Sequence, residues 1–182
     1  MLPFYGYDGK EIAMDILVVV LRIVHVMGAI FWGGAALMME FFISPSIAAT
    51  AEGGQEFARH LINKAHIHIF MMVNAMATIL AGLILYWRDS DGFTSAWMKS
   101  GTGIGFTIGA VFGIIAFISG AIFGRSNAQL GQIGAQIQGK LSSEQLAQLQ
   151  AIQTRLKNIS PIHKTSVLLA MLFMAAARYL VF

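Results

Sequence analysis

The chain has 182 residues, of which 57% are hydrophobic and only 12% are charged. A soluble domain carries about 25% charged residues, so this composition indicates a protein that meets lipid rather than water. The net charge of +3 is small, and the absence of cysteine excludes disulfides, thiolate metal sites and thiol nucleophiles.

Four apolar segments are long enough to cross a bilayer, which takes about 20 helical residues. They are predicted at about residues 13–43, 62–87, 103–124 and 160–182. Because Asp8 and Glu11 precede the first segment and Asp15 lies at its start, we expect a retained span rather than a signal peptide. The length suits one domain. The predicted fold is therefore all-α: a single membrane domain, residues 1–182, built as a four-helix bundle.

The ends of two spans have local signals. The first span is expected to stop before Ser44 and Pro45. The fourth is expected to begin with Ser160 as its N-cap and Pro161 at the first helical position, where the missing N–H is harmless.

The segment 125–158, between the third and fourth spans, is rich in glutamine and has no long apolar run. Apolar residues nevertheless recur there at helical spacing: Leu130, Ile133, Ile137, Leu141, Leu146, Leu149, Ile152 and Leu156. Ser142 and Gln145 have the spacing of a capping box after a turn at Gly139. We predict a helical hairpin that continues both spans, with its apolar stripes packed together or docked on another membrane subunit.

Most lysines and arginines lie in the loops after the first and third spans or at the adjoining span ends: Arg59, Lys64, Arg125, Lys140, Arg155, Lys157 and Lys164. The positive-inside rule places these loops and the hairpin in the cytoplasm and both termini outside. Because topology explains this basic face, we expect no nucleic-acid binding. The third span also carries a glycine stripe of Gly105, Gly109, Gly113, Gly120 and Gly124. That stripe predicts close helix packing, and the same groove would admit the edge of a flat cofactor.

One face of the first span carries polar and aromatic residues, among them Arg22, His25, Trp32 and Glu40. His25 lies roughly 16 Å from the outer end of its helix at about 1.5 Å per residue, which is near mid-membrane. An axial histidine with an arginine one turn outward suits a b-type haem and its propionate. The alternative is a histidine hydrogen-bonded to a neighbouring hydroxyl or carbonyl, with Arg22 extended to the surface.

Three methionines, Met76, Met171 and Met174, lie at a similar depth to His25 and could supply a second axial ligand or hold Cu(I). A second group of histidines lies near the cytoplasmic ends of spans two and four. Within it, His66 and His68 are expected on nearly opposite sides of a helix, and His163 could meet either of them. This group indicates a second haem or a metal ion, or histidines that are only hydrated or hydrogen-bonded.

The run from Leu21 to Gly34, with His25, Gly28 and Trp32 within it, resembles the first helix of small bacterial membrane proteins of the CopD-like and HemJ-like kind. The closing run from Leu172 to Tyr179 is similar to the last span of uncharacterised members. The resemblance implies a bacterial inner-membrane protein in which His25 is the important histidine. It implies copper handling on the CopD-like side. On the HemJ-like side it implies haem b and protoporphyrinogen oxidation, which also needs a lysine in a later helix, where Lys164 stands in this chain.

Three functions follow as hypotheses. The first is a haem b protein that transfers electrons in the membrane, with quinone or a larger redox complex as its partner. The second is a non-catalytic subunit of a membrane complex, and the third is a copper-handling protein. The sequence assigns no catalytic reaction.

Overall fold

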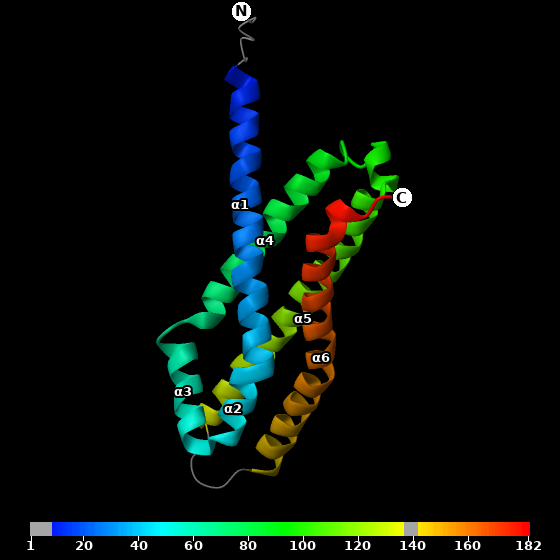
Figure 1. Ribbon diagram of the computed structural model, residues 1–182. Helices are drawn as coiled ribbons and strands as arrows, with labels where there is room; N and C mark the ends of the chain where they lie inside the picture. The colour runs from blue at the N-terminus through cyan, green and yellow to red at the C-terminus, as the bar shows by residue number, and fades with distance from the viewer. Residues whose placement is uncertain (1–8, 137–141) are drawn as a thin grey trace, which may run out of the picture.

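The computed structural model describes residues 9–136 and 142–182 (Figure 1). Four helices are long and apolar enough to cross a membrane: Met14–Ala49, Ile67–Asp89, Gly101–Ile133 and Ser143–Tyr179. No strand occurs in the described ranges. The predicted all-α arrangement of four apolar helices is therefore confirmed. The first of these helices begins, and the last ends, at the same end of the bundle (Figure 1).

The first long helix does not stop where the sequence suggests. Helix α1 (Gly9–Met38) passes into a π-helical turn (η1, Met39–Ile43) and then into α2 (Ser44–Ala49). The predicted end before Ser44 is therefore wrong. Pro45 has no backbone N–H, but it lies in the first turn of α2. The Ser44 N–H bonds to the Met39 carbonyl in the wider π-helical pattern, so the chain continues through the proline.

A separate amphipathic helix, α3 (Ala51–Asn63), follows α2, and hydropathy does not reveal it because it is too polar to be a span. Gly54 is buried where α3 turns back on α2, and a Cβ there would collide with the Ile47 carbonyl. Helix α4 (Ile67–Asp89) begins only after His66, which adopts a left-handed conformation with φ 49°. The second span therefore begins at Ile67 rather than at about residue 62, because the left-handed His66 separates α4 from α3.

The second half of the chain is two long helices. A short 3-10 turn (η2, Ala96–Lys99) precedes α5 (Gly101–Gln136), and α6 (Ser143–Ala176) is followed by η3 (Ala177–Tyr179). The C-terminal end of α5 and the N-terminal end of α6 extend well beyond the predicted apolar segments. The predicted capping box of Ser142 and Gln145 starts α6. The predicted helix start at Ser160 and Pro161 is wrong, because both residues lie inside α6. The predicted turn at Gly139, with Ile137 and Leu141, lies outside the described residues.

The bundle consists of two helix pairs, α1 with α4 and α5 with α6 (Figure 1). Three glycines of the α5 stripe lie in close contacts: a Cβ on Gly105 would touch Ala177, one on Gly109 would touch Met174, and one on Gly120 would touch His163. Gly124 does not take part, because nothing lies within 4 Å of its would-be Cβ. A small core of Ala36, Ala116 and Val167 joins the two pairs. Most large apolar side chains of the long helices are exposed, as expected for a surface that faces lipid.

Candidate functional site

His25 lies where α1 crosses α4, and its ring is held from one side. Its Nδ1 is 2.8 Å from the backbone carbonyl oxygen of Thr78. A carbonyl oxygen can only accept a hydrogen bond, so Nδ1 carries the proton. The neutral ring then has its lone pair on Nε2, and no described residue hydrogen-bonds that atom. The ring is only partly buried, so Nε2 is open to a ligand.

Small and polar residues on α4 let the two helices approach at this point. Gly82 lies directly under the imidazole: a Cβ there would be 2.6 Å from His25 Cε1. One turn along α1, the Gly28 carbonyl accepts a hydrogen bond of 2.9 Å from Asn74 Nδ2, and a Cβ on Gly28 would collide with the Thr78 hydroxyl. We call these five residues the α1–α4 seam. The seam shows that His25 is part of a built contact between helices.

The other residues expected around a cofactor do not gather at His25. Arg22 is exposed, as in the alternative in which its side chain reaches the membrane surface. Trp32 packs edge-on against Phe117 of α5, with ring centroids 6.4 Å apart.

The three methionines take different positions. Met76 is exposed on α4, Met171 lies against Gly33 of α1, and Met174 lies against Gly109 of α5. No described contact joins any of them to His25, so the structure offers a single protein ligand at this histidine.

His66 and His68 lie together, with ring centroids 6.4 Å apart. The expectation that they point to nearly opposite sides is therefore wrong. It assumed a continuous helix, whereas His66 is the left-handed residue before α4. Both side chains are exposed.

His163 lies elsewhere, buried between α5 and α6. Its Nδ1 is 3.1 Å from the Ala116 carbonyl oxygen and 3.0 Å from the Ser119 hydroxyl. It therefore does not join the exposed pair. Among the residues that the structure describes, no three histidine, aspartate or glutamate side chains group closely enough to hold a metal ion.

The structure shows a polar contact of Glu40 that the sequence analysis did not predict. The sequence indicated only that Glu40 lies on the polar face of the first span. Glu40, in the π-helical turn, accepts a 2.7 Å hydrogen bond from the Ser160 hydroxyl and so ties α1 to α6. Its other oxygen, Oε1, is buried without a hydrogen-bond partner in the described ranges. The sequence signal for this contact was a lone carboxylate within an apolar run, because such a group is costly in lipid and needs a partner.

The residues present supply one axial imidazole for a haem, at His25, and an exposed guanidinium one helical turn away, at Arg22. With its Nδ1 hydrogen bond to the Thr78 carbonyl, His25 has the second-nitrogen contact that metal-bound histidines usually make. Comparisons of the chain with protein-family models, with curated proteins and with solved structures found no match.

Proposed function

We propose that this chain is a membrane-embedded b-type haem protein in which His25 Nε2 is the axial ligand, and that it transfers electrons within the bacterial inner membrane. The observation that supports this best is the hydrogen bond between His25 Nδ1 and the Thr78 carbonyl. Metal-bound histidines almost always donate their second ring N–H in this way, which fixes the tautomer and makes the ligating nitrogen more basic.

The depth of His25 strengthens the argument. An ionisable or polar group in the membrane interior is costly and usually has a function. The seam satisfies Nδ1 with the Thr78 carbonyl, but it leaves Nε2 without a partner among the described residues. An iron ion would use that lone pair, whereas a purely structural histidine would need only the bond already made.

Each residue then has a defined task. Thr78 and Gly82 hold and orient the imidazole, and Arg22, one helical turn outward, would meet a propionate. A haem supplies one-electron redox chemistry when bound. The resemblance of the first helix to HemJ-like proteins points to the same cofactor. The separate positions of Met76, Met171 and Met174 favour binding through one protein ligand and do not favour the copper hypothesis.

The visible spectrum of the detergent-purified chain, expressed with haem supplementation, tests the proposal. We expect a Soret band and a split α/β pair on reduction, and we expect His25→Ala to lose them. His68→Ala is the control, because that histidine is exposed and remote from the seam. A colourless wild-type protein would refute haem binding, and an unchanged spectrum in His25→Ala would refute the assigned ligand.

A second candidate is a subunit of a larger membrane complex. It is supported by the length of α5 and α6 beyond the apolar segments and by exposed apolar residues there, such as Leu146 at 47% exposure. Other membrane subunits are the expected partners of this extension. Truncating the extension would release partners that bind there, while the His25 spectrum would remain.

A further inference from the structure

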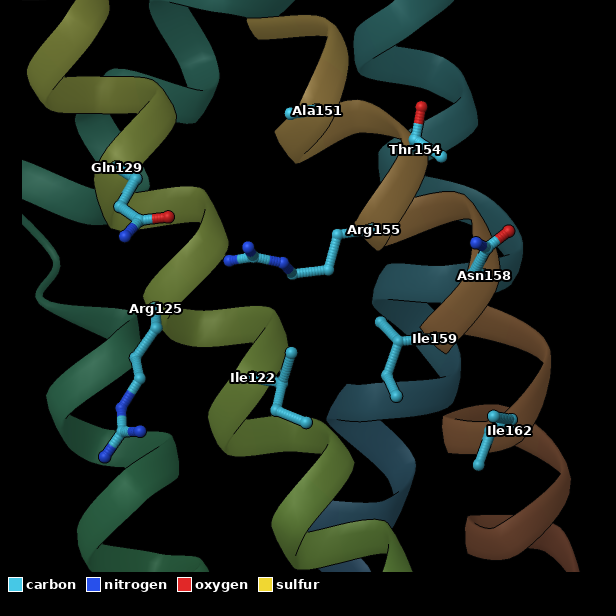
Figure 2. A pocket seen from close by; sticks show the side chains of 9 residues that line it. All are labelled: Ile122, Arg125, Gln129, Ala151, Thr154, Arg155, Asn158, Ile159 and Ile162. Atoms are coloured by element: carbon cyan, nitrogen blue, oxygen red, sulfur yellow. The ribbon is translucent and has the colours of Figure 1, made fainter. Parts of the chain in front are cut away.

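A groove of about 670 Å³ lies between α5 and α6, and none of the residues discussed at His25 lines it (Figure 2). Its volume is in the range of a small-ligand site, about 300–1,000 Å³. Three isoleucines form one part of the lining: Ile122, Ile159 and Ile162. Arg125 and Arg155 form the other part, together with Gln129, Thr154 and Asn158.

The two arginines bring positive charge to this groove from both helices. Figure 2 shows Arg155 extending from α6 across the groove towards α5 and Gln129, whereas the Arg125 side chain extends from α5 away from Arg155. Neither guanidinium has an ion pair or hydrogen bond with any residue in the described ranges, and both residues are exposed. An anion bound in the groove would neutralise the unpaired charge of Arg155. Guanidinium groups bind phosphate through paired hydrogen bonds.

The lining changes character along the groove. On α5, Ile122 precedes Arg125 by about one helical turn on the side of the apolar span. On the antiparallel α6, Ile159 and Ile162 follow Arg155 on that same side. One end of the groove therefore continues the lipid-facing surface, and the other is cationic and rich in amides. A ligand that matches both ends has a negative head and a hydrocarbon tail.

We propose that this groove binds an anionic phospholipid. Its phosphate lies at Arg155, with Arg125 at the edge of the groove, and the upper part of an acyl chain lies along the isoleucines. Basic pockets between membrane helices near the cytoplasmic surface suit such head groups. A free phosphate ion would use the arginines alone and leave the apolar end of the groove unused. The site does not depend on haem binding at His25.

Binding of phosphatidylglycerol with a fluorescent acyl chain to the full-length purified chain tests this. We expect it to bind at least about tenfold more tightly than phosphatidylcholine with the same label, since tenfold is about 1.4 kcal/mol and two basic residues near anionic lipid add about 2 kcal/mol. The double variant Arg125→Gln/Arg155→Gln should lose about tenfold or more in affinity for phosphatidylglycerol. Lys157→Gln is the matched control, because Lys157 is an exposed cation on α6 that does not line the groove. It should change the affinity less than about twofold.

Two further measurements use the wild-type chain, so the test stands even if the double variant fails to fold. Raising the salt concentration should weaken phosphatidylglycerol binding towards that of phosphatidylcholine, because exposed charges are screened. Inorganic phosphate should not displace the lipid. Equal affinity for the two lipids, equal losses in Lys157→Gln and the double variant, or displacement by inorganic phosphate would each overturn the proposal.

Discussion

At the scale of residues, single missing side chains decide which groups meet. Gly82 and Gly28 leave the space in which His25 and Thr78 lie, so the seam depends on the absence of two Cβ atoms. Gly34, on the same helix as His25, is different, because nothing lies within 4 Å of its would-be Cβ. Similar glycines therefore have opposite consequences, depending on the neighbour.

Gly82→Ala should displace the His25 ring, because the new Cβ would lie 2.6 Å from Cε1 and 2.7 Å from Nδ1. The overpacking should lower the free energy of unfolding by about 1–3 kcal/mol. Gly34→Ala is the control and should be neutral or stabilising by up to about 1 kcal/mol, since alanine favours helix. Thermal unfolding of both variants in detergent, followed by circular dichroism, measures this. Equal stability of the two variants would show that the seam is not closely packed.

At the scale of elements, the interruptions of the helices shape this chain as much as the helices do. The π-helical turn at Met39–Ile43 lets α1 run on through Pro45, and it carries Glu40 to its bond with Ser160. The left-handed His66 lies between α3 and α4 and is the N-cap residue of α4. By contrast, Pro161 is accepted inside α6. A helix in a bundle tolerates the loss of one backbone hydrogen bond when packing on its neighbours is maintained.

The start of α6 is fixed by a local signal that can be tested alone. Ser142 Oγ accepts from the Gln145 N–H at 3.1 Å, and Gln145 Oε1 accepts from the Ser142 N–H at 3.0 Å. Ser142→Ala should cost about 1 kcal/mol at this helix end, which corresponds to about fivefold faster amide exchange in the first turn. Hydrogen–deuterium exchange reads this directly. Ser143→Ala is the control and should exchange like the wild type, because Ser143 is exposed and outside the capping box.

At the scale of the whole molecule, two closely packed pairs share a small core. Within each pair, hydrogen bonds and glycine contacts link the helices, as at His25 and at His163. Between the pairs, Glu40 with Ser160 and Trp32 with Phe117 make the connection. The remaining apolar surface faces outward, which suits a bundle held in lipid by its outer surface and by a few internal polar contacts.

The absence of cysteine makes the orientation of the molecule easy to test. Ala96→Cys, between α4 and α5, should react with a membrane-impermeant thiol reagent in intact spheroplasts. Ala147→Cys, on the extension of α6, should react only after the membrane is opened, because the positive-inside rule places that end in the cytoplasm. Both alanines are exposed, so accessibility within the protein does not differ. The reverse pattern of labelling would show that the orientation is inverted.

The sequence by itself determined the fold class, the four apolar helices and the start of α6 at Ser142. Hydropathy and a capping box depend on residues that are close together in the chain, so the sequence alone reveals them. It also identified His25 as a polar group in an apolar helix. It could not locate the end of the first span or the start of the fourth correctly. Whether Pro45 ends a helix, or Pro161 begins one, depends on the backbone hydrogen bonds made around each proline.

Only the tertiary structure decided what each polar group meets. It brought His25 to the Thr78 carbonyl, His163 to Ser119 and Glu40 to Ser160, pairs that are far apart in the chain. It also placed Arg125 and Arg155 on the two sides of one groove. These contacts depend on helix crossing and relative depth, which are set by the packing of small residues between helices, and no local pattern in one helix contains that information.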